Sequence, residues 1–85
     1  MACSDDVVPV IIVNWNGKQF LPECLDALYI QTLKTLEIVL VDNGSRDGSV
    51  EFVRRNYPEI RVISLPRNLG FAAANNLALR TVRSP

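Results

Sequence analysis

Three short runs of apolar, largely β-branched residues constrain the fold of this chain most, because each run stops at a polar turn. We expect strands at 9–14, 36–42 and 60–65. β-Branched side chains are restricted at χ1 and suit a pleated strand. The first two runs are almost continuous, which is typical of strands covered on both faces. The third run alternates more, so we expect it nearer an edge of the sheet.

Two segments with helical periodicity lie between these strands, and a third follows them. We expect helices at 18–32, 47–56 and 71–83. In the first segment the apolar residues recur three or four positions apart and so share one face of a helix. These residues are Leu21, Cys24, Leu25, Leu28 and Tyr29. A helix with one apolar face packs that face against a core.

The alternation of strands and helices predicts a three-layer α/β fold, a Rossmann-like βαβαβα half-domain. Right-handed crossovers between parallel strands give the sheet order 3-2-1, with the first two helices on one face and the third on the other. The length of 85 residues suits one small domain. We expect a flexible tail at 1–7 and the folded domain at 8–85.

The composition excludes several classes of function. Nine basic and nine acidic residues leave no formal net charge, so there is no electrostatic basis for binding nucleic acid or an anionic membrane. No apolar run approaches the ~20 residues of a membrane span. Histidine, the commonest metal ligand and general base, is absent. We therefore expect no nucleic-acid partner and no membrane segment.

The two cysteines indicate a reducing compartment. Cys3 lies in the polar tail, Cys24 lies at a helix position that we expect to be buried, and the two form no C-x-x-C pair. Asp5 and Asp6 stand where a signal peptide carries basic residues. We therefore expect free thiols and a location in the cytoplasm.

Polar loops follow all three expected strands, at Asn14–Gly17, Asp42–Ser45 and Arg67–Gly70. Parallel strands place their carboxyl ends at one edge of the sheet, where open α/β sheets bind ligands. Two interpretations of the loops stay open. Asn, Gly and Asp are ordinary turn formers, and the same residues offer the polar groups that recognise a nucleotide.

The loops do not match the best-known nucleotide-binding motifs. An acid at the end of the second strand, here Asp42, binds the ribose in dinucleotide-binding Rossmann domains. Those domains also need G-x-G-x-x-G after the first strand, whereas Asn14–Gly17 contains a single glycine. The P-loop pattern G-x-x-x-x-G-K-[ST] is absent as well.

Several side chains near the loops allow two interpretations. Trp15, with Asn16, either flanks a base or sugar or packs beneath the first helix, and we favour packing for Trp15. Arg67 either meets a diphosphate or stays solvated, and we favour the solvated state. Of Asn75 and Asn76, we expect one to face solvent and the other to hydrogen-bond the loops.

Three segments together resemble the amino-terminal part of family 2 glycosyltransferases, inverting enzymes with the GT-A fold. The segments are VIIVNWNG at 10–17, EIVLVDNGSRDGS at 37–49 and RNLGFAAANN at 67–76. The second and third are fairly specific to the family. They look closest to rhamnosyltransferase-like members that make cell-surface polysaccharides. The resemblance covers 8–83.

The resemblance implies a nucleotide-diphosphate-sugar donor and a role for each loop. Asp42 would hydrogen-bond the base, the end of the first strand would contact the nucleoside, and Arg67–Gly70 would lie near the base or diphosphate. Asp47 would shape its loop and cap the second helix. The nucleotide-binding residues implied in this way are Val13, Asn14, Trp15, Asn16, Asp42, Asn43, Arg67, Asn68 and Gly70.

The chain departs from the family in what it lacks. Members carry an Asp-x-Asp-type motif shortly after this point, which holds a divalent metal, Mg²⁺ or Mn²⁺, against the diphosphate. They also carry a later carboxylate that deprotonates the acceptor hydroxyl. This sequence has no D-x-D and stops at Pro85. We therefore expect a truncated domain that binds a nucleotide weakly, has no metal or catalytic residue of its own, and is inactive alone.

Two further expectations complete the sequence-based interpretation. The alternative function is a small α/β interaction module without nucleotide binding or catalysis. In the sheet order 3-2-1 the first strand is an edge, and its unpaired backbone groups around Ile11–Val13 are a template for pairing with another chain. We therefore expect self-association through this edge.

Overall fold

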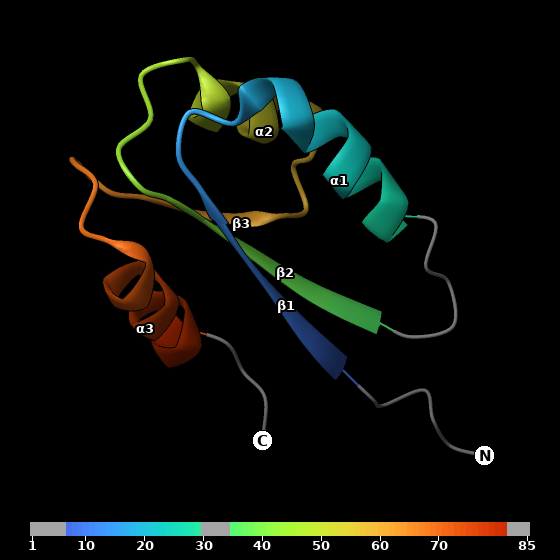
Figure 1. Cartoon of the computed structure of the whole chain (residues 1–85). Coiled ribbons are helices and arrows are strands. Elements are labelled where there is room, and N and C mark those ends of the chain that lie inside the picture. Colours follow the sequence, from blue (N-terminus) through green and yellow to red (C-terminus); the bar gives the residue numbers. More distant parts are fainter. Residues whose placement is uncertain (1–6, 30–34, 82–85) are drawn as a thin grey trace.

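The computed structural model describes residues 7–29 and 35–81, which form a three-stranded sheet with helices on both faces (Figure 1). The strands are β1 (Val7–Asn14), β2 (Thr35–Asp42) and β3 (Arg61–Ser64). The α-helices are α1 (Leu21–Tyr29), α2 (Ser49–Asn56) and α3 (Phe71–Thr81). A short 3-10 helix, η2 (Lys18–Phe20), leads into α1.

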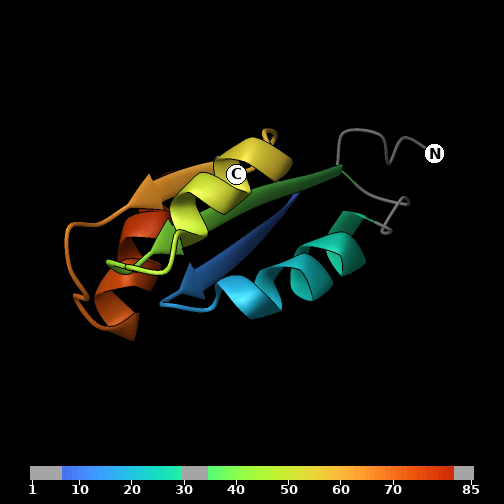
Figure 2. The same ribbon diagram turned by 90° about the horizontal axis from the view of Figure 1, so that it is seen from above.

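The three strands are parallel and lie in the order β1-β2-β3, which confirms the predicted sheet order 3-2-1. The register pairs Asn14 with Asp42 and Asp42 with Ser64, so the strands end level with one another. Helices α1 and α2 cover one face of the sheet and α3 covers the other (Figure 2). The predicted three-layer α/β fold is therefore confirmed, and the loops after the strands share one edge.

Alternate residues of β2 supply the two halves of the core. Leu40 is fully buried on the α1 and α2 side, together with Leu25 and Val53. Val39 and Val41 are fully buried on the other side, against α3. Each fully buried aliphatic side chain of this size contributes roughly 1.5–3 kcal/mol relative to exposure. β2 is thus covered on both faces, as its continuous apolar run predicted.

Several element boundaries differ from the predicted ones. β1 begins at Val7, inside the predicted tail, and the rest of that tail lies outside the described residues. The predicted helix at 18–32 starts as η2 and continues as α1; its last three residues also lie outside the described part. α2 begins at Ser49 instead of Asp47 because Gly48, just before it, has a left-handed φ of +84°.

The third strand and the third helix are shorter than predicted. β3 covers 61–64 of the predicted 60–65. α3 covers 71–81 of the predicted 71–83, and the last two of those residues lie outside the described part. Among the residues that the structure describes, no helix is both long and apolar enough to cross a bilayer.

The prediction that Cys24 is buried is wrong, because its side chain is exposed. The buried face of α1 runs through Leu21 and Leu25, and Leu28 packs against the same cluster. At 3.6 residues per turn, Cys24 lies just beyond the margin of that face. The predicted free thiol at Cys3 lies outside the described residues.

Candidate functional site

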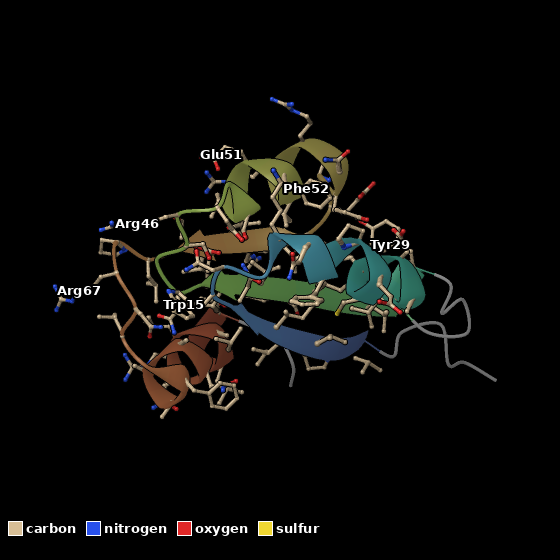
Figure 3. All side chains as sticks on the ribbon, turned by 45° about the horizontal axis from the view of Figure 1, so that its top comes forward. Trp15, Tyr29, Arg46, Glu51, Phe52 and Arg67 are labelled. Atoms are coloured by element: carbon tan, nitrogen blue, oxygen red, sulfur yellow. The ribbon has the colours of Figure 1, made fainter. Side chains whose placement is uncertain are left out.

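Three polar loops meet at the carboxyl edge of the sheet and are here called the rim, which comprises residues 14–17, 42–48 and 66–70. Figure 3 shows one labelled side chain from each loop at this end of the molecule: Trp15, Arg46 and Arg67. The parallel topology therefore brings the loops of the predicted site residues together, as the strand order predicted.

Asp42 is the buried centre of the rim, with 1% of its surface exposed. Its Oδ1 accepts a hydrogen bond from Nδ2 of Asn14 at 2.9 Å, and its Oδ2 accepts one from the Ser45 amide at 2.8 Å. Hydrogen bonds to a charged group contribute about 1.5–3 kcal/mol each. Both carboxylate oxygens therefore hold the first two loops in place.

Asn16 and Ser45 join the first two loops a second time. Oγ of Ser45 accepts hydrogen bonds from the Asn16 amide at 2.8 Å and from Nδ2 of Asn14 at 3.3 Å. In return, the Arg46 amide donates to Oδ1 of Asn16 at 2.8 Å. Asn16 has a φ of +51°, a left-handed conformation that asparagine adopts more readily than most residues. These polar residues therefore act both as turn formers and as links between loops.

Asn43 links the third loop to the other two. Its side chain is buried, and its Oδ1 accepts a hydrogen bond from the Leu69 amide at 2.9 Å. Its Nδ2 donates to the Gly70 carbonyl at 3.2 Å. Its backbone amide donates to the Asn14 carbonyl at 2.8 Å. The rim is therefore one hydrogen-bonded unit.

Asp47 fastens the starts of two helices. Its Oδ2 accepts from the Lys18 amide at 3.0 Å, and its Oδ1 accepts from the amide and hydroxyl of Ser49. Burial alone would raise the pKa of this carboxyl, but the hydrogen bonds outweigh it and hold the pKa below its usual value. The resulting stabilisation is present at neutral pH and is lost as the pH falls through the lowered pKa. These contacts agree with the structural role that the resemblance implied.

The prediction that Trp15 packs beneath the first helix is wrong, because 58% of its surface is exposed. Arg67 is exposed, as we favoured from the sequence. Oδ1 of Asn68 accepts from the Gly70 amide at 2.8 Å within the third loop. Val13 packs toward α3. The predicted set thus divides into exposed residues (Trp15, Asn16, Arg67, Asn68, Gly70), buried ones (Asn14, Asp42, Asn43) and the half-buried Val13.

The predicted hydrogen bond between α3 and the rim loops is wrong. Nδ2 of Asn75 donates to the Phe71 carbonyl within the helix at 3.3 Å, and Asn76 is exposed. Asn43 makes the link instead. The sequence signal for this role is weak, since an amide before a glycine at the end of a strand also fits an ordinary turn.

An open hollow of about 500 Å³ lies beside the rim, near the starts of η2 and α2. It is lined by Asn16, Lys18, Gln19, Asp47 and Phe52. Nζ of Lys18 stands 5.9 Å from the centre of the Phe52 ring, within the range of a cation–π contact. Of the predicted site residues, Asn16 borders this hollow.

The described residues do not fit a divalent metal. Within 7–29 and 35–81, no three Asp, Glu, His or Cys side chains lie together as a ligand group. Asp42 and Asp47, the carboxylates of the rim, both use their two oxygens on donors of the protein. Hard cations such as Mg²⁺ need several oxygen ligands around one centre. The metal that the resemblance implied therefore has no ligand set among these residues.

Residues 10–85 match the family model described as Glycosyl transferase family 2. The chain belongs to glycosyltransferase family 2. The match confirms the resemblance that the loops after β1, β2 and β3 suggested. The matched residues include the whole rim.

Curated family relatives match most of this chain. It is 34% identical over 71 residues to N-acetylglucosaminyl-diphospho-decaprenol L-rhamnosyltransferase of Mycobacterium tuberculosis, covering 84% of this chain and 23% of that protein. It is 36% identical over 81 residues to glycosyltransferase GlyA of Streptococcus pneumoniae, covering 92% of this chain and 12% of that protein. The chain therefore spans less than a quarter of the length of these relatives.

A solved glycosyltransferase shares the fold. Mannosyltransferase PcManGT from Pyrobaculum calidifontis, in complex with GDP-Man and Mn²⁺, matches with a TM-score of 0.82 and 34% identity. The match covers 89% of this chain and 24% of that one. The mannosyltransferase has the GT-A fold, which confirms the predicted fold family for this part of the chain.

Proposed function

We propose that this chain forms the part of a family 2 glycosyltransferase that binds the nucleotide of a nucleotide-diphosphate-sugar donor for cell-surface polysaccharide synthesis. The observation that carries the proposal is the rim, in which buried Asp42 and Asn43 join three loops and leave Trp15 and Arg67 exposed. A site formed before its ligand arrives loses less conformational freedom on binding. The rhamnosyltransferase relative and the GDP-Man in the mannosyltransferase support a sugar nucleotide.

The rim side chains offer chemistry suited to the parts of such a donor. The exposed indole of Trp15 offers a flat face to a base or sugar. The guanidinium of Arg67 has the fork geometry that pairs with phosphate oxygens. Asp42 keeps lone pairs beyond the two in use, and we place it near the base. The other residues proposed to form the nucleotide site are Val13, Asn14, Asn16, Asn43, Asn68 and Gly70.

Titration with UDP, GDP and dTDP, followed through tryptophan fluorescence, tests this proposal. Trp15 is the one tryptophan of the chain and is exposed at the rim, so a base bound there changes its emission. We expect a saturable change with at least one nucleotide and a Kd on the order of 1 mM or lower, about −4 kcal/mol. Arg67→Ala is expected to weaken the diphosphate roughly tenfold and to leave the corresponding nucleoside unchanged.

The same titration discriminates the alternative function. An absence of saturable change in fluorescence and in calorimetry would contradict nucleotide binding. If the chain also bound a protein partner tightly, the small α/β interaction module would become the better explanation. An equal loss of diphosphate and nucleoside affinity in Arg67→Ala would remove Arg67 from the diphosphate contact.

We further propose that this chain does not transfer sugar by itself. Of the two rim carboxylates, Asp42 is placed at the base of the nucleotide and Asp47 holds the starts of η2 and α2, so we assign neither as the group that takes a proton from an acceptor hydroxyl. A divalent metal in the whole protein is supported by the Mn²⁺ of the mannosyltransferase. Sugar transfer by this chain from any nucleotide sugar would contradict the proposal. A location in the cytoplasm stays a prediction.

The outer edge of β1 is the surface that we propose for self-association. The Asn14 carbonyl accepts from the Asn43 amide on the β2 side, and backbone groups of successive strand residues point to opposite sides. Pro9, Ile11 and Val13 therefore direct their backbone groups outward. Pro9 lacks an N–H, which a strand tolerates on an open edge. The outward groups of Ile11 and Val13 suit pairing with a strand of a second copy.

Proline substitutions at neighbouring positions test this edge. Ile11→Pro removes an outward donor and leaves the ladder to β2 intact, so we expect a folded chain that sediments as a monomer. Ile12→Pro removes a donor that serves β2 and is expected to unfold the sheet. Ile11 and Ile12 are both half-buried, so the two substitutions remove a similar amount of side-chain packing. A wild-type monomer at all concentrations in analytical ultracentrifugation would contradict the proposal.

A further inference from the structure

Few contacts hold the third loop of the rim, residues 66–70, against the rest of the described chain. All of its residues are exposed. Oδ1 of Asn68 bonds the Gly70 amide within the loop. In the described part of the chain, the side chain that reaches the loop from another loop is Asn43, which binds the Leu69 amide and the Gly70 carbonyl. A loop without buried apolar side chains opens readily unless hydrogen bonds hold it.

The backbone beside Asn43 supports the other end of the same loop. Gly44 has a φ of +80°, and a Cβ built on it would stand 2.6 Å from Cα of Arg67 and 2.9 Å from the amide nitrogen of Asn68. The two backbones are therefore in direct contact. Gly44 therefore supports the loop at Arg67, and Asn43 holds it at Gly70, the residue before α3.

We propose that Asn43 is a positioning residue that holds the segment Arg67–Gly70, and with it the Arg67 guanidinium, in place for the diphosphate of a nucleotide ligand. This inference rests on the proposed function and deepens it. The segment needs one acceptor for the Leu69 amide and one donor for the Gly70 carbonyl. A carboxamide supplies both at once, whereas a carboxylate supplies acceptors alone.

Asn43→Asp gives a variant whose hydrogen bonding depends on pH. When ionised, the new carboxylate still accepts from the Leu69 amide but repels the Gly70 carbonyl. When protonated, it donates and accepts as the amide does. The charged side chains of the rim are Asp42, Arg46, Asp47 and Arg67. Position 43 is buried, with 2% of its surface exposed, and burial disfavours the ionised form of a carboxyl, so proton uptake at position 43 begins above the pH usual for Asp.

The test compares nucleotide affinities of wild type and Asn43→Asp at pH 5 and pH 8, with whichever of UDP, GDP and dTDP the wild type binds most tightly. We expect the variant to bind roughly tenfold more weakly at pH 8 and to approach the wild type at pH 5. In an Arg67→Ala background the same substitution should have little further effect on the diphosphate, because Asn43 acts through Arg67. An equal, pH-independent loss in both backgrounds would overturn the inference.

Hydrogen exchange separates this inference from the proposed function. The protection factor of the Leu69 amide needs no ligand and is expected to fall about tenfold at pH 8 in Asn43→Ala, which removes the acceptor of that amide. If the wild type binds no nucleotide, the proposed function fails. The protection factor still measures how strongly the Asn43 side chain stabilises the loop. Unchanged protection of Leu69 at pH 8 would overturn the positioning role.

Discussion

Replacing Gly44 by alanine is expected to lower the free energy of unfolding by about 2–5 kcal/mol. The positive φ of +80° costs an L-residue roughly 1–2 kcal/mol. The added Cβ would also lie 2.6 Å from Cα and the carbonyl carbon of Arg67. Because these are backbone atoms, they cannot rotate aside as a side chain does. The third loop must therefore shift away from the second, and the strain adds to the conformational cost.

Gly48→Ala is the matched control for this substitution. Gly48 has a similar φ of +84°, but its added Cβ would meet Nζ of Lys18 at 3.5 Å, the flexible end of a side chain. We expect a loss of about 1–2 kcal/mol from the backbone conformation alone. The difference between the two variants in urea denaturation measures the overlap between the loops. Equal losses would show that the contact between Gly44 and Arg67 is not tight in solution.

Gly44→Ala is also expected to weaken nucleotide binding by tenfold or more, roughly 1.4 kcal/mol, because it displaces the loop that carries Arg67. Gly48→Ala leaves that loop in place, so its affinity should match the wild type. The comparison is made under conditions in which urea denaturation shows both variants to be folded. Equal affinities of the two variants would contradict a role of the third loop in binding.

The order of the strands was predictable because it depends on coarse properties of the chain. β2 is apolar throughout, and Val39 and Leu40 are buried on opposite faces. Helix boundaries were less predictable because they depend on single polar contacts. The start of α2 at Ser49 follows from the hydrogen bond to the Asp47 carboxylate and from the left-handed conformation of Gly48. Neither feature leaves a periodic pattern in the sequence.

The position of the candidate site in the fold was predictable, but the contacts and exposure of each side chain were not. Parallel topology alone puts Asp42 and Arg67 on one rim. Trp15 was expected beneath a helix, yet it is 58% exposed, because hydrophobicity does not indicate which way a residue after a strand points. The role of linking the loops was expected from Asn75 or Asn76, and Asn43 has it instead. Choosing among equivalent amides requires the three-dimensional distance between donors and acceptors.

Exchanging the side chains of Asp42 and Asn14 is expected to separate the structural role of the carboxylate from its proposed contact with a base. Asp42 accepts from Asn14 and from the Ser45 amide. Asp42→Asn alone turns an amide nitrogen toward one of these donors and leaves a buried donor without an acceptor. We expect a loss of about 2–3 kcal/mol in urea denaturation, since the acceptor removed is charged.

The double variant Asn14→Asp with Asp42→Asn restores the complementary pair. The amide at position 42 donates to the carboxylate at position 14, and its oxygen accepts from the Ser45 amide. Both positions are buried, with 6% and 1% of their surfaces exposed, so the exchange keeps one carboxylate in the same surroundings. We expect the free energy of unfolding to return to within about 1 kcal/mol of the wild type. A double variant as unstable as the sum of the single ones would show that the two side chains are not coupled.

Nucleotide affinity should not recover with stability in the double variant. The exchange moves the negative charge from the end of β2 to the end of β1, so a base that pairs with a carboxylate oxygen at position 42 finds an amide there. Binding is therefore expected to stay roughly tenfold or more below the wild type. If affinity recovers together with stability, the carboxylate acts through the architecture of the rim and not on the base. Because the two readouts diverge only when one of the two exchanged side chains touches the ligand, the exchange decides between a direct contact by this pair and a purely structural role.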